Sequence, residues 1–110
     1  GMFYNTTNLT SVNLSSFDTS NVTDMGAMFN SASSLTSLNL SHFDTSSVVY
    51  VGGMFGKTWN LNTLYANGWD ISSVSCFHSS AFSTVNNSLV VYCDQGGSPG
   101  TGTLFGETCN

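Results

Sequence analysis

Basic residues are almost absent from this chain of 110 residues. Lysine and arginine together contribute one residue, Lys57, against six aspartates and glutamates, and the formal net charge at pH 7 is -5. Proteins that bind nucleic acid neutralise phosphates with clusters of lysine and arginine. The composition therefore excludes nucleic acid as a partner. Charged residues of either sign make up only 6% of the chain, so hydroxyl and amide side chains must provide its polar surface.

Long hydrophobic runs are missing as well. No segment approaches the roughly 20 consecutive apolar residues that a membrane-spanning helix needs. No basic segment is followed by the apolar stretch of a signal peptide. We therefore expect a soluble chain with no membrane insertion. A chain of 110 residues can form one domain with an elongated repeat core, and is too short for a second globular unit.

Residues suited to catalysis or metal binding are few and scattered. The chain has two histidines and three cysteines, no two cysteines are spaced as Cys-x-x-Cys, and His42 and His78 are 36 residues apart. Zinc sites need ligands at much closer spacing. Cys76 and His78 stand two residues apart on an expected helix, where their side chains would point in different directions. We expect no enzyme activity, no metal and no cofactor.

What the chain does contain is an internal repeat. The stretch LTSVNLSSFDTSNVTDMGAMF, residues 9–29, recurs as LTSLNLSHFDTSSVVYVGGMF, residues 35–55, and more loosely once again. Equivalent positions return every 26 residues, as in Leu9, Leu35 and Leu61. A fixed period of this length is typical of repeat proteins, in which each unit buries its apolar face against the next unit.

Each repeat has two halves with different hydrophobic spacing. In the first half apolar and polar residues alternate, as in Val12, Asn13 and Leu14, which is the period of a strand. We expect parallel strands at residues 9–14, 35–40 and 61–66. In the second half the apolar residues recur at the spacing of one helix face, and a serine precedes each segment as a candidate N-cap. We expect short helices at residues 21–29, 47–55 and 73–82.

These elements predict an α/β fold, a right-handed solenoid similar to leucine-rich repeats with an irregular C-terminal cap. Residues 1–88 would form about three repeats, and residues 89–110 the last strand and the cap. Met2 and Phe3 match the Met-Phe pairs of later repeats, so we expect a chain cut from a longer protein. The first strand has no preceding strand to pair with. Its edge could therefore contact a second copy of the chain or an upstream module.

The repeat resembles that of the BspA-like bacterial surface proteins, whose leucine-rich-type repeat has a consensus close to LTSLDLSNFDTSNVTNMSSMF. The similarity is close over residues 2–55 and looser to about residue 82. It implies a secreted or cell-surface protein, often linked to adhesion, and does not imply one ligand. The chain departs from the family pattern where many members have cysteine, and carries Thr6, Ala32 and Thr58 there.

An aromatic residue and an aspartate follow each expected strand: Phe17 with Asp18, Phe43 with Asp44, and Trp69 with Asp70. We expect the aromatic rings to point inward as a stacked column. The aspartates should accept hydrogen bonds from N–H groups of the turn or of the helix start. The alternative for the aspartates is a cation site, which the small number of acidic residues within each repeat disfavours.

The glycine-rich tail lies between Cys93 and Cys109 and contains the single proline of the chain. Leu104 and Phe105 are its large apolar residues, and we expect them to hold the tail to the core. A disulfide between Cys93 and Cys109 would close a loop of about 15 residues and contribute roughly 3 kcal/mol in the chain-entropy model. The rival pairing joins Cys76 to Cys93. Either disulfide implies an oxidising compartment.

The solvent-facing positions of the expected strands carry hydroxyl and amide side chains with a few aromatic residues. Such surfaces suit sugar rings or the centre of a protein interface. The candidate ligand-binding residues are Asn13, Asn39, His42, Tyr50, Trp59 and Tyr65. We expect a non-catalytic, extracellular adhesion module of a bacterial surface protein that recognises a glycan or an envelope protein. The alternative is a structural spacer or stalk-tip domain with no ligand of its own.

Overall fold

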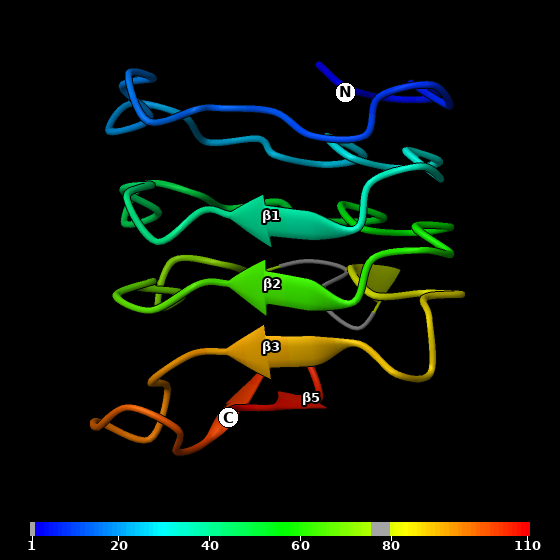
Figure 1. Ribbon diagram of the computed structural model, residues 1–110. Coiled ribbons are helices and arrows are strands. Elements are labelled where there is room, and N and C mark those ends of the chain that lie inside the picture. Colours follow the sequence, from blue (N-terminus) through cyan, green and yellow to red (C-terminus); the bar gives the residue numbers. More distant parts are fainter. Residues whose placement is uncertain (1, 76–79) are drawn as a thin grey trace.

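The computed structural model describes residues 2–75 and 80–110 (Figure 1). These residues contain five short strands: β1 (Ser37–Asn39), β2 (Thr63–Tyr65), β3 (Val90–Tyr92), β4 (Thr103–Leu104) and β5 (Glu107–Thr108). The described residues contain no α-helix, and turns connect the strands. The expected α/β solenoid similar to leucine-rich repeats is therefore wrong. The chain forms a small β-rich fold.

The strands β1, β2 and β3 lie side by side in one parallel sheet (Figure 1). Their central residues, Leu38, Leu64 and Val91, pair in register and are buried in the core. The parallel pairing expected between residues 35–40 and 61–66 is confirmed, although each strand is only three residues long. Consecutive repeats therefore stack in layers, each one strand spacing from the next.

The first expected strand, residues 9–14, does not form a strand. Leu9 and Val12 are partly exposed, whereas their equivalents one repeat later, Leu35 and Leu38, are 0% and 2% exposed. The reason is that a layer in the middle of the stack is covered on both sides. Residues 9–14 are covered only on the side that faces β1 (Figure 1).

The second half of each repeat runs behind the sheet and is made of turns (Figure 1). The helices expected at residues 21–29 and 47–55 are therefore wrong, and the third expected helix, residues 73–82, lies partly outside the described residues. Alternate N–H groups of one repeat donate to carbonyl groups of the next, at 2.9 Å in each case: Met25 to Tyr50, Ala27 to Gly52, and Phe29 to Met54. An α-helix would use these N–H groups within its own segment.

Recurring left-handed residues explain why helical spacing does not produce a helix here. Asn5, Ser31 and Lys57 occupy the same position of successive repeats, with φ angles of 58°, 61° and 58°. Ala27 and Gly53 share a second such position, with φ angles of 56° and 66°. A left-handed residue ends a right-handed helical turn. Apolar residues spaced three apart therefore lie on the inner side of consecutive tight turns.

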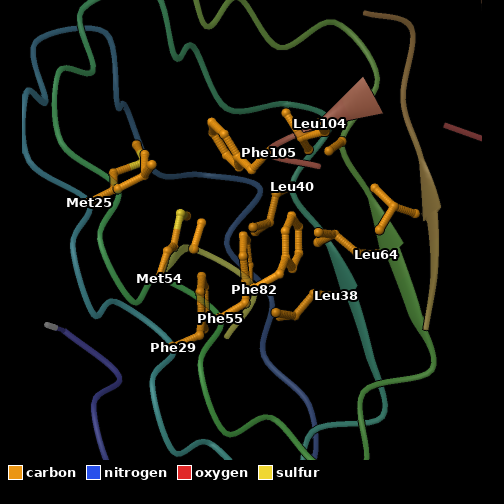
Figure 2. Close-up of a cluster of buried hydrophobic side chains, with 14 of the residues drawn as sticks. Met25, Phe29, Leu38, Leu40, Met54, Phe55, Leu64, Phe82, Leu104 and Phe105 are labelled. Atoms are coloured by element: carbon orange, nitrogen blue, oxygen red, sulfur yellow. The ribbon is translucent and has the colours of Figure 1, made fainter. Parts of the chain in front are cut away.

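Phenylalanine rings from the back segments stack through the core (Figure 2). The centroids of Phe3, Phe29, Phe55 and Phe82 are 5.4, 5.8 and 5.0 Å apart in that order, and consecutive rings are within 12° of parallel. We call these four residues the phenylalanine column. The sequence predicted a different column, made of the aromatic residues that follow each strand. That prediction is wrong for Phe17, which is 40% exposed, whereas Phe43 and Trp69 are buried as expected.

Buried threonines join the corners of successive repeats. The Thr19 hydroxyl accepts a hydrogen bond from the N–H of Asp44 at 2.9 Å and donates to the carbonyl of Asp44 at 3.1 Å. Thr45 makes the same two bonds with Asp70, at 2.9 and 3.0 Å. We call each such pair of bonds a threonine clamp. Ile71 occupies the corresponding position of the third repeat, and it has no hydroxyl group to continue the series.

The C-terminal end of the stack is closed by β4 and β5, which pair antiparallel. The predicted disulfide between Cys93 and Cys109 is present. The backbone of Cys109 also forms an isolated parallel β-bridge with Val91 at the outer edge of β3. Leu104 and Phe105 are buried in the same hydrophobic cluster as the repeats, as we expected for the tail (Figure 2). The cap and the repeats therefore share one core.

Candidate ligand-binding face

The outward residues of the parallel sheet form one row across the strands. Asn39 in β1 pairs in register with Tyr65 in β2, and Tyr65 pairs with Tyr92 in β3. Asn13 occupies the same position one repeat before Asn39, and all four side chains are exposed. We call these four residues the strand-face row. The structure thus places three of the predicted ligand-binding residues in one line and adds Tyr92.

Two stacked tyrosines form the C-terminal half of the row. The rings of Tyr65 and Tyr92 lie 5.0 Å apart and 10° from parallel, and the residues are 39% and 37% exposed. Each ring covers one face of the other. An aromatic face therefore remains on the side of Tyr65 that looks toward Asn39. Sequence reasoning missed Tyr92, although the segment 90–92 ends in tyrosine just as the segment 63–65 does.

A pocket of about 160 Å³ opens beside the N-terminal half of the row. It is lined by Val12, Asn13, Leu14, Ser15, Asn39 and His42. His42 is held in place, because its Nε2 lies 2.5 Å from the carbonyl oxygen of Leu14 and its ring meets Phe43 edge-on at 5.0 Å. A carbonyl oxygen only accepts hydrogen bonds, so Nε2 is the donor of this bond, and in the tautomer that the bond selects Nδ1 is an acceptor.

The two asparagines of the row are also held by local hydrogen bonds. The Oδ1 atom of Asn13 accepts the N–H of Ser15 at 3.0 Å. The Oδ1 atom of Asn39 accepts the N–H of Ser41 at 3.1 Å and its hydroxyl at 2.6 Å. Within the described part of the chain, neither side-chain Nδ2 group makes a hydrogen bond. Both amides therefore present fixed donors at the pocket.

The other two predicted ligand-binding residues lie away from this row. Trp59 is 50% exposed and lies in the turn that leads into β2, whereas His42 follows the end of β1. Because the strands are parallel, these two residues stand at opposite ends of the sheet. Tyr50 lies in a back segment, with its ring over Gly26 and Gly52. The structure does not bring Tyr50 or Trp59 into one site with Tyr65.

Each corner aspartate is held by the serine two residues later. The Oδ1 atom of Asp44 accepts the Ser46 hydroxyl at 2.6 Å and the Ser46 N–H at 3.0 Å. These bonds, the hydroxyl bond first, hold the pKa of Asp44 below its usual value of 3.8, against the repulsion of Asp18 and Asp70. In the same way, Ser20 lowers the pKa of Asp18 and Ser72 lowers the pKa of Asp70. The expected role of the aspartates as hydrogen-bond acceptors in the turn is confirmed. The serines that were expected to cap helices instead donate hydrogen bonds to these aspartates.

Some of the chemistry considered from the sequence falls outside what the structure describes. Cys76 and His78, which the sequence analysis considered as candidate catalytic residues, lie outside the described residues. Within residues 2–75 and 80–110, no group of three or more histidine, cysteine, aspartate or glutamate side chains is arranged to hold a metal ion. The same residues include no helix with the length and hydrophobicity needed to cross a bilayer.

The fold and its exposed row define a small, repeat-built β protein closed by a disulfide cap. Comparison with family models gives a match over residues 1–89 to the family described as "Mycoplasma protein of unknown function, DUF285". The match covers most of the chain, and the chain belongs to this family of surface-associated bacterial repeat proteins. The match does not specifically support the BspA-like family that the repeat resembles. The comparisons found no matching curated protein and no matching solved structure.

Proposed function

We propose that the chain is a non-catalytic, extracellular binding module that recognises a glycan or an envelope protein through its strand-face row. The observation that carries the proposal is the continuity of this surface. An aromatic face on Tyr65 adjoins the amide of Asn39, and Asn39 lines one pocket together with Asn13 and His42. Stacking surfaces and fixed hydrogen-bond groups lie side by side there.

The tyrosine pair supplies the apolar part of the interaction. Aromatic rings present a large rigid surface, and tyrosine is frequent where protein surfaces bind partners. Because Tyr65 and Tyr92 already stack on each other, they lose little rotamer freedom when a ligand binds. A sugar ring or a flat peptide group placed on the outer face of Tyr65 would also contact the Asn39 amide.

The polar part of the surface is uncharged, which favours neutral partners. Asn13 and Asn39 offer side-chain N–H donors, and His42 offers an acceptor nitrogen, each restrained by the hydrogen bonds described above. Preorganised donors and acceptors of this kind suit the hydroxyl groups of a sugar or the polar groups of a protein surface. We expect modest affinity for a single sugar unit and stronger binding when several copies are displayed together.

Two further observations support an extracellular location. The disulfide between Cys93 and Cys109 needs an oxidising environment to form and persist. Membership of a surface-associated bacterial family agrees with this environment. On this proposal the module acts outside the cell, attached to or released from the bacterial surface.

The test is a glycan array run beside a pull-down from target-cell envelopes with purified variants. The double variant Tyr65→Ala with Tyr92→Ala should lose binding in whichever assay the wild type is positive. Tyr4→Ala is the matched control, because Tyr4 is an exposed tyrosine in the first turn, outside the strand-face row, and its variant should bind as the wild type does. Trp59→Ala measures whether the site extends to the other end of the sheet.

Unchanged binding by the double tyrosine variant would show that the ligand binds elsewhere. If the wild type binds nothing in either assay, the alternative of a structural spacer is favoured. Circular dichroism of each variant must match the wild type, so that a loss of binding is not confused with unfolding.

A further inference from the structure

The strand-face row contains a gap between its tyrosine pair and Asn13. The rings of Tyr65 and Tyr92 stack 5.0 Å apart, which is about one strand spacing, so the plane of the Tyr65 ring lies across the direction in which the layers stack. Asn39, the next residue of the row, has a much shorter side chain. Asn13 lies one layer beyond Asn39, and two strand spacings of roughly 9 to 10 Å separate its layer from that of Tyr65. The gap above Asn39 therefore has an aromatic face on one side and an amide on the other.

The polar groups around this gap match sugar hydroxyls better than peptide groups. The two asparagines that line the pocket offer Nδ2 donors. His42 offers Nδ1, which is an acceptor in the tautomer that its bond to Leu14 selects. A sugar hydroxyl both donates and accepts hydrogen bonds. Two adjacent hydroxyls can therefore bind an amide and the imidazole together, whereas a peptide group presents its N–H and its C=O on opposite sides.

The size of the gap favours a single sugar ring over a protein partner. The pocket at its base has a volume of about 160 Å³, well below the roughly 300 to 1,000 Å³ of clefts that enclose a whole drug-sized ligand. A stable protein interface buries roughly 800 Å² on each partner around an apolar core. The strand-face row has no such core, because Tyr65 and Tyr92 cover each other's inner faces and its other two residues are asparagines.

The charges around the site favour a neutral sugar. Asp18 and Asp44 follow the pocket residues Ser15 and His42 within three positions along the chain, and hydrogen bonds hold the pKa of both carboxyls below the usual value of 3.8. The single lysine of the chain, Lys57, lies in the turns that lead into β2, at the end of the sheet opposite to His42. An anionic sugar would therefore meet carboxylates and no lysine or arginine here.

We propose that this gap is a subsite for one neutral galactoside, the terminal sugar of a glycan, an inference that rests on the proposed function of the strand-face row. In a galactoside one ring hydroxyl is axial and projects from one face, and C–H bonds gather on the other face. The C–H face would stack on the outer face of Tyr65, and the axial hydroxyl and its neighbour would bind the Asn39 amide and His42. In the epimeric glucoside every ring hydroxyl is equatorial and the two faces are alike. A gap with an aromatic face on one side and an amide on the other therefore favours the galactoside.

The probe is methyl β-galactoside, titrated into the full chain labelled with ¹⁵N, with methyl β-glucoside as the matched control. The two sugars differ only in the configuration of one carbon. The side-chain NH₂ resonances of Asn13 and Asn39 should shift with the galactoside, because new hydrogen bonds form at Nδ2. The glucoside should bind about tenfold more weakly, since it lacks the axial hydroxyl and loses its hydrogen bond.

A protein variant gives the second arm of the test. Asn39→Asp keeps the Oδ1 atom that accepts the N–H and the hydroxyl of Ser41 and removes the Nδ2 donor, so galactoside binding should weaken about tenfold. Asn87→Asp is its matched control. It adds the same charge at an exposed asparagine in the turn before β3, outside the row, and should leave galactoside binding unchanged.

The inference is overturned if the two sugars bind equally, if neither shifts the side-chain resonances of Asn13 and Asn39, or if sialic acid binds more tightly than the galactoside. Capture of an envelope protein that depends on Tyr65 and Tyr92, without galactoside binding, would also overturn it and would leave the proposed function standing. Glycan or envelope binding by the tyrosine variants is measured separately, so the failure of this inference can be told from the failure of the proposed function.

Discussion

Replacing one ring of the phenylalanine column should show how strongly the stacked repeats depend on each other. Phe55 is fully buried, and its ring contacts Phe29 at 5.8 Å, Phe82 at 5.0 Å and Trp69 at 6.4 Å. Truncating a buried phenylalanine to alanine costs about 3 to 5 kcal/mol, a range that includes the lost ring contacts, and a ring with three aromatic neighbours belongs in its upper half. We therefore expect Phe55→Ala to reduce the free energy of unfolding by about 4 to 5 kcal/mol. Small domains have only about 5 to 15 kcal/mol in total.

The matched control is Phe3→Ala at the end of the same column. Phe3 is partly exposed and, among the residues that the structure describes, stacks only on Phe29, at 5.4 Å, so its truncation should cost only about 1 to 2 kcal/mol. Urea unfolding, followed by the fluorescence of the buried Trp69, gives both values from the midpoints and slopes. Equal losses for the two variants, or a loss below about 1 kcal/mol for Phe55→Ala, would refute the argument that the column couples the repeats.

The remaining predictions concern the corners, the carboxylates and the cap. Thr45→Val should cost about 2 kcal/mol in urea unfolding, because it leaves the N–H and the carbonyl of Asp70 without their partner, and Thr45→Ser should recover most of that loss. The melting temperature should decline as the pH falls below about 4. The pKa of Asp44 is lower in the folded chain than its usual value of 3.8, so the ionised carboxylate stabilises the fold at pH values above 3.8, and this contribution is lost as the pH falls through the lower pKa of the folded chain. Ser46→Ala should weaken this decline, and an unchanged pH profile would contradict the prediction. Reducing the cap disulfide with dithiothreitol should lower the free energy of unfolding by about 3 kcal/mol, and an unchanged urea midpoint would show that the cap is held by packing alone.

The repeat period predicted the parallel pairing of β1 with β2, because it reports which residues stack on one another, although the fold class expected from it was wrong. Leucines spaced by one period lie in register in neighbouring strands, as Leu38 and Leu64 do. The disulfide was also predictable, since Cys93 and Cys109 bracket a tail with little core of its own. The strand register follows from a pattern that is repeated along the sequence, and the disulfide joins two cysteines that lie close together in it.

The helices could not be excluded from spacing alone, because apolar residues three apart fit either a helix face or consecutive tight turns. Backbone conformation decides between them. Ser31 and Lys57 have positive φ angles, which cannot be predicted from the sequence because serine and lysine rarely adopt this conformation. The candidate site shows the same limit. Tyr65 and Tyr92 share a row because of strand register, whereas Tyr50 and Trp59 are separated from it by the path of the chain, which composition does not report.

The recurring left-handed position also offers a route to engineering thermostability. A residue with a side chain in this conformation stores about 1 to 2 kcal/mol of backbone strain, which glycine largely avoids. Asn5, Ser31 and Lys57 each hold that angle, so glycine there would relieve strain, less the added entropy of a more flexible unfolded chain. Because the position returns in every repeat, one substitution can be copied along the chain. These positions lie in neighbouring layers joined by backbone hydrogen bonds, such as that from Asn5 to Asn30 and that from Ser31 to Gly56, so the gains of the copied substitutions should depend on one another.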